Sequence, residues 1–136
     1  MSYTPRRTKY RKMHKGKIGG SVGNSVRPSF GAYAFQACAG GRVSSACLEA
    51  VRRVMSRCFR RSGQIWIRRF PDVVQTQKPL EVRMGKGKGN PSGWVAIVRP
   101  GQILFEISGA TPAQLTKARR LMSVRLPFPI RLLENT

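Results

Sequence analysis

Hydrophobic residues recur at steps of three and four between positions 45 and 62, the spacing of one face of an α-helix. The repeating positions are Cys47, Val51, Val54, Met55 and Cys58. Ser44 or Ser45 is suited to cap the start, and Gly63 stands where a left-handed residue often follows a helix. The pattern therefore predicts a helix from Ser45 to about Ser62.

A second helix is predicted by the sequence Thr111-Pro112-Ala113-Gln114. Threonine followed three positions later by glutamine is a capping box, and proline is favoured at the first helical position. The apolar face that follows consists of Leu115, Ala118, Leu121 and Met122. Pro127 stops this helix.

Short runs of alternating, β-branched or aromatic residues predict strands around these helices. They cover residues 30–37, 64–70, 80–84 and 130–133. Two further runs, 93–98 and 102–108, flank Pro100-Gly101, a pair that favours a type II turn, so these two runs are predicted to form a β-hairpin. Strands and helices do not alternate regularly. The predicted fold class is therefore α+β, with two helices packed on a mixed or antiparallel β-sheet.

Basic residues far outnumber acidic ones: 26 Lys and Arg stand against 5 Asp and Glu, giving a formal net charge of +21. Self-repulsion at this density favours a polyanionic partner, either a nucleic acid or an anionic membrane surface. No run approaches about 18 consecutive apolar residues, and neither predicted helix has the Trp/Phe/Leu-rich face of an interfacial helix. Arginine, the better bidentate phosphate ligand, outnumbers lysine 18 to 8. A nucleic acid is therefore the predicted partner.

The 136 residues suffice for one domain, predicted over residues 29–136, preceded by a basic N-terminal extension over residues 1–28. The extension is expected to be disordered alone and to fold against its partner, with a solvated tail as the alternative. It is Arg-rich like an organellar transit peptide, but glycines interrupt it and it has no amphipathic stripe, so it is interpreted as part of the mature protein. Its candidate nucleic-acid contacts are Arg6, Arg7, Lys9, Arg11, Lys12, His14, Lys15 and Lys17.

The first predicted helix carries arginines on the face opposite its apolar stripe. Glu49 lies one helical turn before Arg53 and is positioned to pair with it. Solvated helix faces usually mix charges of both signs, whereas this one hardly does. A helix held between a sheet and a phosphate backbone is therefore predicted, and the candidate contacts are Arg52, Arg53, Arg57, Arg60 and Arg61.

Residues 83–90 read RMGKGKGN and form the centre of a glycine- and lysine-rich loop over residues 83–92. A phosphate-binding P-loop requires Gly-Lys followed by Ser or Thr, and the dinucleotide motif G-x-G-x-x-G requires a final glycine; the run satisfies neither. Glycine allows close backbone approach, so this loop is suited to carry positive charge into a crowded anionic space. A flexible hairpin tip with incidental lysines is the alternative. The candidate residues are Arg83, Met84, Gly85, Lys86, Gly87, Lys88, Gly89 and Asn90.

No catalytic or metal-binding cluster stands out in the sequence. The five carboxylates are scattered, His14 is the single histidine, and the three cysteines lack C-x-x-C spacing. The cysteines, Cys38, Cys47 and Cys58, are interpreted as free thiols in a reducing compartment. The chain is therefore predicted not to be an enzyme, and no metal, cofactor or small-molecule substrate is expected.

Several stretches together resemble the L-sixteen family of large-subunit ribosomal proteins, in its bacterial and organellar form, over nearly the whole chain. They are Lys9–Gly16, Glu49–Arg53, Gly63–Arg68, Phe70–Asp72, Lys78–Asn90 and Trp94–Ala96. Residues 18–29, the stretch Ala39-Gly40-Gly41 and the C-terminal IRLLENT depart from the family pattern. No family contact is carried over to those regions.

The resemblance implies a structural component of the large ribosomal subunit, with two helices on a sheet and a hammerhead-like hairpin. It implies binding to large-subunit ribosomal RNA (rRNA) near the peptidyl-transferase centre, through the basic extension and the arginine face. It also implies that the loop from Arg83 to Asn90 points toward tRNA at the A site, with the P site as an alternative, and that neighbouring ribosomal proteins are partners. The competing hypothesis is a basic RNA or DNA chaperone without a fixed site. The stretches GNPSGW and GQILFEISG favour a mitochondrial ribosome, and a bacterial cytoplasm is the alternative.

Overall fold

The computed structural model describes residues 3–20, 22–23 and 26–135, so parts of the predicted extension at residues 1–2, 21 and 24–25 lie outside the described residues. The described chain contains two helices and two antiparallel sheets, which confirms the predicted α+β class. The elements are β1 (Tyr33–Ala37), β2 (Gly41–Ser44), α1 (Ser45–Cys58), β3 (Gln64–Ile67), β4 (Val73–Gln77), β5 (Asn90–Val98), β6 (Ile103–Ser108), α2 (Pro112–Ser123) and β7 (Ile130–Glu134).

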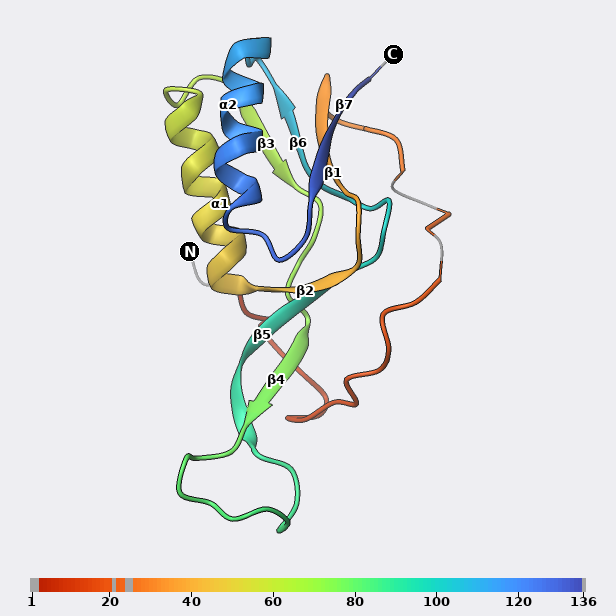
Figure 1. The fold of residues 1–136 in the computed structure, drawn as a ribbon, viewed down its shortest axis with the longest axis vertical. Coiled ribbons are helices and arrows are strands. Elements are labelled where there is room, and N and C mark those ends of the chain that lie inside the picture. The colour runs from red at the N-terminus through yellow and green to blue at the C-terminus, as the bar shows by residue number, and fades with distance from the viewer. Residues whose placement is uncertain (1–2, 21, 24–25, 136) are drawn as a thin grey trace.

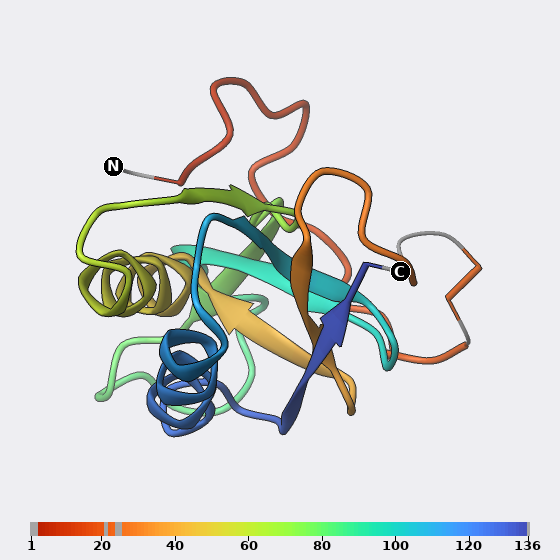
Figure 2. The ribbon, with the colours of Figure 1, turned by 90° about the horizontal axis from the view of Figure 1, so that it is seen from above.

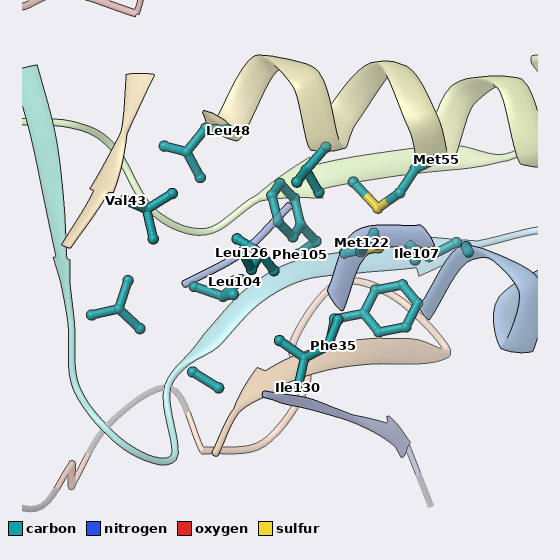
Figure 3. Packing of buried hydrophobic residues seen from close by; sticks show 14 of the residues in the cluster. Phe35, Val43, Leu48, Met55, Leu104, Phe105, Ile107, Met122, Leu126 and Ile130 are labelled. Atoms are coloured by element: carbon teal, nitrogen blue, oxygen red, sulfur yellow. The ribbon is translucent and has the colours of Figure 1, made fainter. Parts of the chain in front are cut away.

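The strands divide into two sheets, where the sequence predicted one. The four-stranded sheet has the order β3-β6-β1-β7, and the three-stranded sheet has the order β2-β5-β4. Both helices lie on one side of the four-stranded sheet (Figure 2). The core between them and the sheet contains Phe35, Met55, Phe105, Ile107 and Met122, all of which are fully buried (Figure 3).

The three-stranded sheet carries the most prominent projection of the molecule. Strands β4 and β5 pair from Val73–Val95 to Gln77–Asn90 and form a long hairpin. The loop over residues 78–89 lies at the end of this hairpin, far from both helices (Figure 1). This projecting hairpin corresponds to the hammerhead-like element that the resemblance implied.

The predicted hairpin between runs 93–98 and 102–108 is wrong, although the turn between them exists. Gly101 has a φ of 84°, and the N–H of Gln102 donates to the carbonyl of Arg99 at 3.2 Å. The strands on either side belong to different sheets, because β6 pairs with β1 and β3 while β5 pairs with β2 and β4. The backbone of the turn is hydrogen-bonded to the end of β1: the N–H of Ala37 donates to the carbonyl of Gln102, and the N–H of Gly101 donates to the carbonyl of Ala37, at 2.8 Å each.

The predicted strand over residues 80–84 is also wrong. Leu80 and Met84 are 101% and 98% exposed, and the N–H of Val82 donates to the carbonyl of Pro79 in a turn. The strand that enters the loop is β4, which begins at Val73, seven residues before the predicted start at Leu80. The alternation in 80–84 has no neighbouring strand to pair with, so the local pattern does not produce a strand.

The first helix begins as predicted and ends earlier. The hydroxyl of Ser44 accepts from the N–H of Cys47 at 3.2 Å, which caps the helix. The helix ends at Cys58, because Arg60 and Arg61 adopt left-handed backbone angles with φ of 52° and 65°. Gly63 is therefore not the residue that ends the helix. Its φ of 84° serves a close approach to β6, where a Cβ would lie 2.5 Å from the carbonyl oxygen of Ser108.

The C-terminal elements follow the prediction more closely. In the second helix, the side-chain oxygen of Gln114 accepts from the N–H of Thr111 at 3.0 Å, as the capping box requires. The helix ends at Ser123, four residues before Pro127. Strand β7 forms at the edge of the four-stranded sheet, where residues 130–133 were predicted to add a strand.

Candidate nucleic-acid interface

The basic extension lies along the surface of the domain, and its described part contains no helix or strand. All eight of its candidate side chains, from Arg6 to Lys17, are exposed. Arg42 of β2 holds the extension in place, since its Nη2 donates to the carbonyls of Lys15 at 3.2 Å and Gly16 at 2.8 Å. The side-chain cations therefore point outward while the backbone is attached to the sheet.

A second attachment joins the extension to the glycine-lysine loop. Lys12 Nζ donates to the carbonyl of Lys88 at 2.9 Å, and Lys88 Nζ donates in return to the carbonyl of Met13. The two lysines neutralise no charge by these contacts, because both acceptors are backbone carbonyls. Two segments that are 75 residues apart in the sequence, and both predicted to bind nucleic acid, are thus brought side by side.

The loop presents its side chains to solvent. Residues 83–88 are all exposed, and Gly85, Lys86 and Gly87 have φ values of 93°, 54° and 84°. A Cβ on Gly85 or Gly87 would meet nothing within 4 Å, so these glycines serve the left-handed backbone and not a crowded contact. Gly89 is different, because a Cβ there would lie 2.5 Å from the backbone of Gln77. It closes the base of the loop where the hairpin strands meet.

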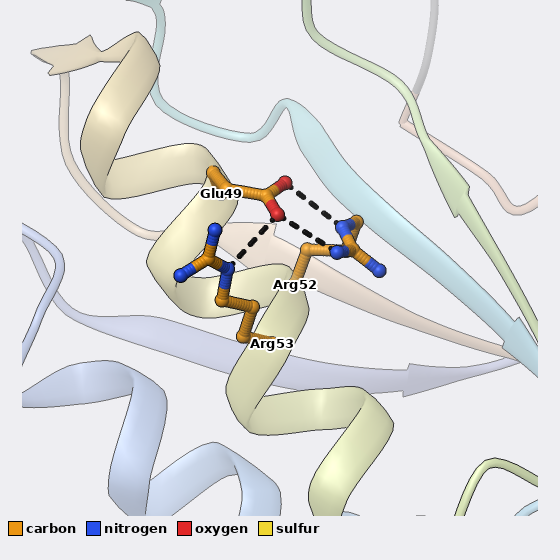
Figure 4. A network of polar contacts seen from close by, with 3 residues as sticks. All are labelled: Glu49, Arg52 and Arg53. Atoms are coloured by element: carbon orange, nitrogen blue, oxygen red, sulfur yellow. Dashed lines mark hydrogen bonds and ion pairs between the residues drawn. The ribbon is translucent and has the colours of Figure 1, made fainter. Parts of the chain in front are cut away.

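On α1, Glu49 holds two of the predicted arginines (Figure 4). Its carboxylate accepts from Arg52 Nη2 at 2.7 Å and from Arg53 Nε at 3.1 Å, which confirms the predicted pairing one turn later in the helix. The hydrogen bond from Arg52 is the main cause that lowers the pKa of Glu49 from 4.5 to about 2. The phenol of Tyr3 also interacts with Glu49 and Arg52, and its pKa is raised, mainly by burial. The start of the extension therefore covers this ion pair, and Arg52 is half-buried.

Glu49→Gln is expected to lower the free energy of unfolding at pH 7 by about 1–2 kcal/mol, because it removes a carboxylate that accepts charge-assisted hydrogen bonds. The folded pKa lies below the unfolded one, so the contribution is present above pH 4.5 and is lost as the pH falls toward 2. Urea unfolding of both proteins at pH 7, 4.5 and 2 measures this.

Glu81→Gln is the matched control for that experiment, because it removes the same charge from an exposed loop position. It should leave the unfolding free energy close to that of the wild type at each pH. If Glu49→Gln and the wild type lost stability in parallel on acidification, the Glu49 ion pairs would not contribute to stability.

The remaining arginines of the predicted helix face are exposed. They are Arg53, Arg57, Arg60 and Arg61. The last two lie beyond the end of α1, in the left-handed turn, so they do not continue the helical face as predicted. The helix therefore offers two exposed arginines, and the following turn offers two more.

The structure also shows cations that the sequence analysis did not select. Arg42 attaches the extension, and a further exposed group lies on and just after α2: Lys117, Arg119, Arg120 and Arg125. The signal was present in the sequence, because these residues alternate with the apolar positions of the predicted helix and include no acidic neighbour. The second helix has an arginine- and lysine-bearing face like that of the first.

Other kinds of site find no support in the described part of the chain. No group of three or more His, Cys, Asp or Glu side chains lies close enough to hold a metal ion. Cys38, Cys47 and Cys58 are free thiols, and burial raises the pKa of Cys47. No helix among the described residues has the length and hydropathy needed to cross a membrane.

An α+β domain whose exposed cations extend over a projecting loop, an attached basic segment and two helices is typical of a nucleic-acid-binding protein. The chain belongs to the family described as Ribosomal protein L16p/L10e, whose model matches residues 5–133. This confirms the family that the sequence motifs resembled.

Several relatives named "Large ribosomal subunit protein uL16" are similar over most of their length. The chain is 49% identical to that of Blochmanniella pennsylvanica (strain BPEN) over 133 residues, which cover 98% of each protein. It is 52% identical to that of Buchnera aphidicola subsp. Cinara cedri (strain Cc) over 125 residues, covering 91% of this chain and 90% of the relative. It is 49% identical to that of Buchnera aphidicola subsp. Acyrthosiphon pisum (strain Tuc7) over 124 residues, with the same coverage.

These findings bear on two of the predictions. The family is one of structural ribosomal proteins, which confirms the prediction that the chain is not an enzyme. The relatives named above are bacterial, so they do not support the mitochondrial interpretation and favour its bacterial alternative.

Proposed function

We propose that this protein is a structural component of the large ribosomal subunit and binds its rRNA near the peptidyl-transferase centre. The observation that carries the proposal is the family match over residues 5–133, together with relatives named as proteins of the large ribosomal subunit. The net charge of +21 supports it, because a domain so basic is best stabilised against a polyanion. The partners proposed are rRNA and neighbouring ribosomal proteins, in a bacterial cytoplasm.

Two groups of residues are proposed to bind different RNAs, one rRNA and the other tRNA. The extension from Arg6 to Lys17 and the exposed arginines of α1 and its following turn bind rRNA phosphates, since these cations point outward from an attached backbone. The loop from Arg83 to Asn90 reaches toward tRNA at the A site. Its place at the end of the β4–β5 hairpin supports this, as does the exposure of its three cations, Arg83, Lys86 and Lys88.

Sedimentation of a native cell extract through sucrose at high salt tests the proposal. The protein is expected to migrate with the large subunit as the salt concentration rises, because shape-specific docking adds to charge attraction. A non-specific basic chaperone would instead move to the light fractions, since its affinity depends almost wholly on counterion release. That result would overturn the proposed function.

Deleting residues 1–17 is expected to weaken binding to large-subunit rRNA by at least tenfold, because it removes eight exposed candidate side chains. The slope of log affinity against log salt should also become less steep. Filter binding of an rRNA transcript over a range of salt concentrations measures both quantities. Unchanged affinity and slope would show that the extension does not contact rRNA.

A further inference from the structure

Two arginines that belong neither to the extension, the loop nor the helices lie where the chain passes between the two sheets. Arg69 follows β3, and Arg99 follows β5. Together with Asp72 and Gln102 they line a hollow of about 540 Å³. Arg99 is exposed at the rim of this hollow, and Arg69 is half-buried.

The positive charge of Arg69 has no ion-pair partner among the described residues, unlike that of the neighbouring Arg68. Arg68 pairs with the buried carboxylate of Glu106, so its charge is balanced inside the protein. In the described part of the chain no ion pair involves Arg69 or Arg99, and the buried Nε of Arg69 has no hydrogen-bond partner there. Buried donors without a partner are rare in native proteins, and a bound ion is one of the explanations for such a group.

The electrostatics of the hollow favour an anion. Burial lowers the pKa of Arg69, and the positive charges of Arg68 and Arg99 lower it further, against the opposing effect of Asp72. Cations therefore crowd this place, with one exposed carboxylate nearby. A phosphate that entered beside Arg69 would relieve this repulsion and would accept hydrogen bonds from its guanidinium.

We propose that Arg69 and Arg99 form a binding site for a backbone phosphate of RNA. The planar fork of arginine matches the oxygens of a phosphate in two parallel hydrogen bonds, and two such groups around one hollow fix the phosphate's position. Arg99 at the rim captures the anion, and the half-buried Arg69 holds it. The inference rests on the proposed function, since RNA is the source of the phosphate.

Arginine side-chain NMR tests the site directly, because each Nε–Hε group gives its own signal. Inorganic phosphate and a short A-form RNA duplex are the two probes, added separately to the full chain. The Arg69 and Arg99 signals are expected to shift with the duplex, and more weakly with phosphate. A shift with phosphate but none with RNA would overturn the proposal by showing a small-anion site.

Substitutions then measure the effect on rRNA binding. Arg99→Gln, at an exposed position that should leave folding intact, and the double variant with Arg69→Gln are expected to weaken binding of an rRNA transcript up to tenfold. The salt slope should fall by about 1, for one lost phosphate contact. Asp72→Asn removes the competing carboxylate and should strengthen binding. Lysine at both positions is the matched control, since it keeps the charge, and should restore binding only in part.

The outcomes separate this inference from the proposed function. If the wild type binds rRNA and enters the subunit while Arg99→Gln and the double variant keep its affinity and slope, the phosphate site is wrong and the proposed function stands. If the wild type itself shows no rRNA binding, the proposed function fails first.

Discussion

Glu106→Ala is expected to lower the free energy of unfolding by about 3–5 kcal/mol, the cost typical of removing one partner of a buried ion pair. Glu106 is fully buried in β6. Its carboxylate accepts from the backbone N–H groups of Ser29 at 2.9 Å, Phe30 at 2.5 Å and Gly31 at 3.0 Å, and it pairs with Arg68. Alanine would leave three backbone donors and one guanidinium without their acceptor.

Through these hydrogen bonds Glu106 also holds residues 29–31, which precede β1, against the four-stranded sheet. Phe30 stacks on Trp66 with ring centroids 6.2 Å apart, and Arg68 lies over the Phe30 ring at 4.7 Å. A Cβ on Gly31 would lie 2.6 Å from the carbonyl oxygen of Ile107, so the backbone there approaches β6 too closely for any side chain. Loss of the carboxylate should therefore release Phe30 and change the fluorescence of Trp66.

The stability that Glu106 contributes is expected to decrease as the pH falls. Burial by itself raises the pKa of Glu106, but hydrogen bonds from Phe30, Gly31 and Ser29 and the charge of Arg68 outweigh burial and hold the pKa below its ordinary value. The stabilisation is therefore present above the unfolded pKa and is lost as the pH falls through the folded one. The difference between the wild type and Glu106→Ala should shrink on acidification.

Urea unfolding followed by tryptophan fluorescence at neutral and acidic pH measures both effects. Glu134→Gln, at an exposed position of β7, is the control and should change little. A loss below about 1 kcal/mol for Glu106→Ala at pH 7 would mean that water replaces the carboxylate at little cost.

Local patterns in the sequence predicted the helices well because each helix buries a stripe whose spacing is set by its own geometry. The buried positions Val51 and Met55 of α1, and Leu115, Ala118 and Met122 of α2, fall on the predicted faces. Strand partners depend on residues far away in the sequence. The turn at Pro100-Gly101 was therefore predicted correctly, while the pairing of the strands beside it was not.

In the candidate nucleic-acid interface, too, local features could be predicted from the sequence and contacts between distant segments could not. Clusters of exposed cations are visible in the sequence because they need no partner within the chain, and the structure places the predicted ones at the surface with the half-buried exception of Arg52. Sequence alone could not show that Arg42 attaches the extension, or that Lys12 and Lys88 meet, since these contacts join segments tens of residues apart. Nor could it show that Glu106 is buried, because an isolated acidic residue in a strand ordinarily faces water.

Replacing Lys86 and Lys88 together with alanine is expected to weaken binding of tRNA at the A site by about ten- to a hundredfold, at about 1.4 kcal/mol for each tenfold step. Each lysine is exposed on the projecting loop and is proposed to contact tRNA phosphates. Assembly into the large subunit should continue, because the rRNA contacts proposed for the extension and α1 remain. Filter binding of aminoacyl-tRNA to ribosomes carrying the variant, with sedimentation to confirm incorporation, measures the two effects separately.

The single variants separate a direct contact from positioning of the loop. Among the described residues Lys86 has no side-chain hydrogen-bond partner, so Lys86→Ala tests its charge alone. Lys88→Ala also removes the contact with Met13, one of the two that attach the loop to the extension, while the carbonyl at position 88 can still accept from Lys12. Deleting residues 86–89 is a harsher test, because it also removes Gly89, whose backbone lies against Gln77 at the base of the hairpin.

If the double variant bound tRNA normally, the loop would not face tRNA; if it failed to enter subunits, the loop would serve assembly instead.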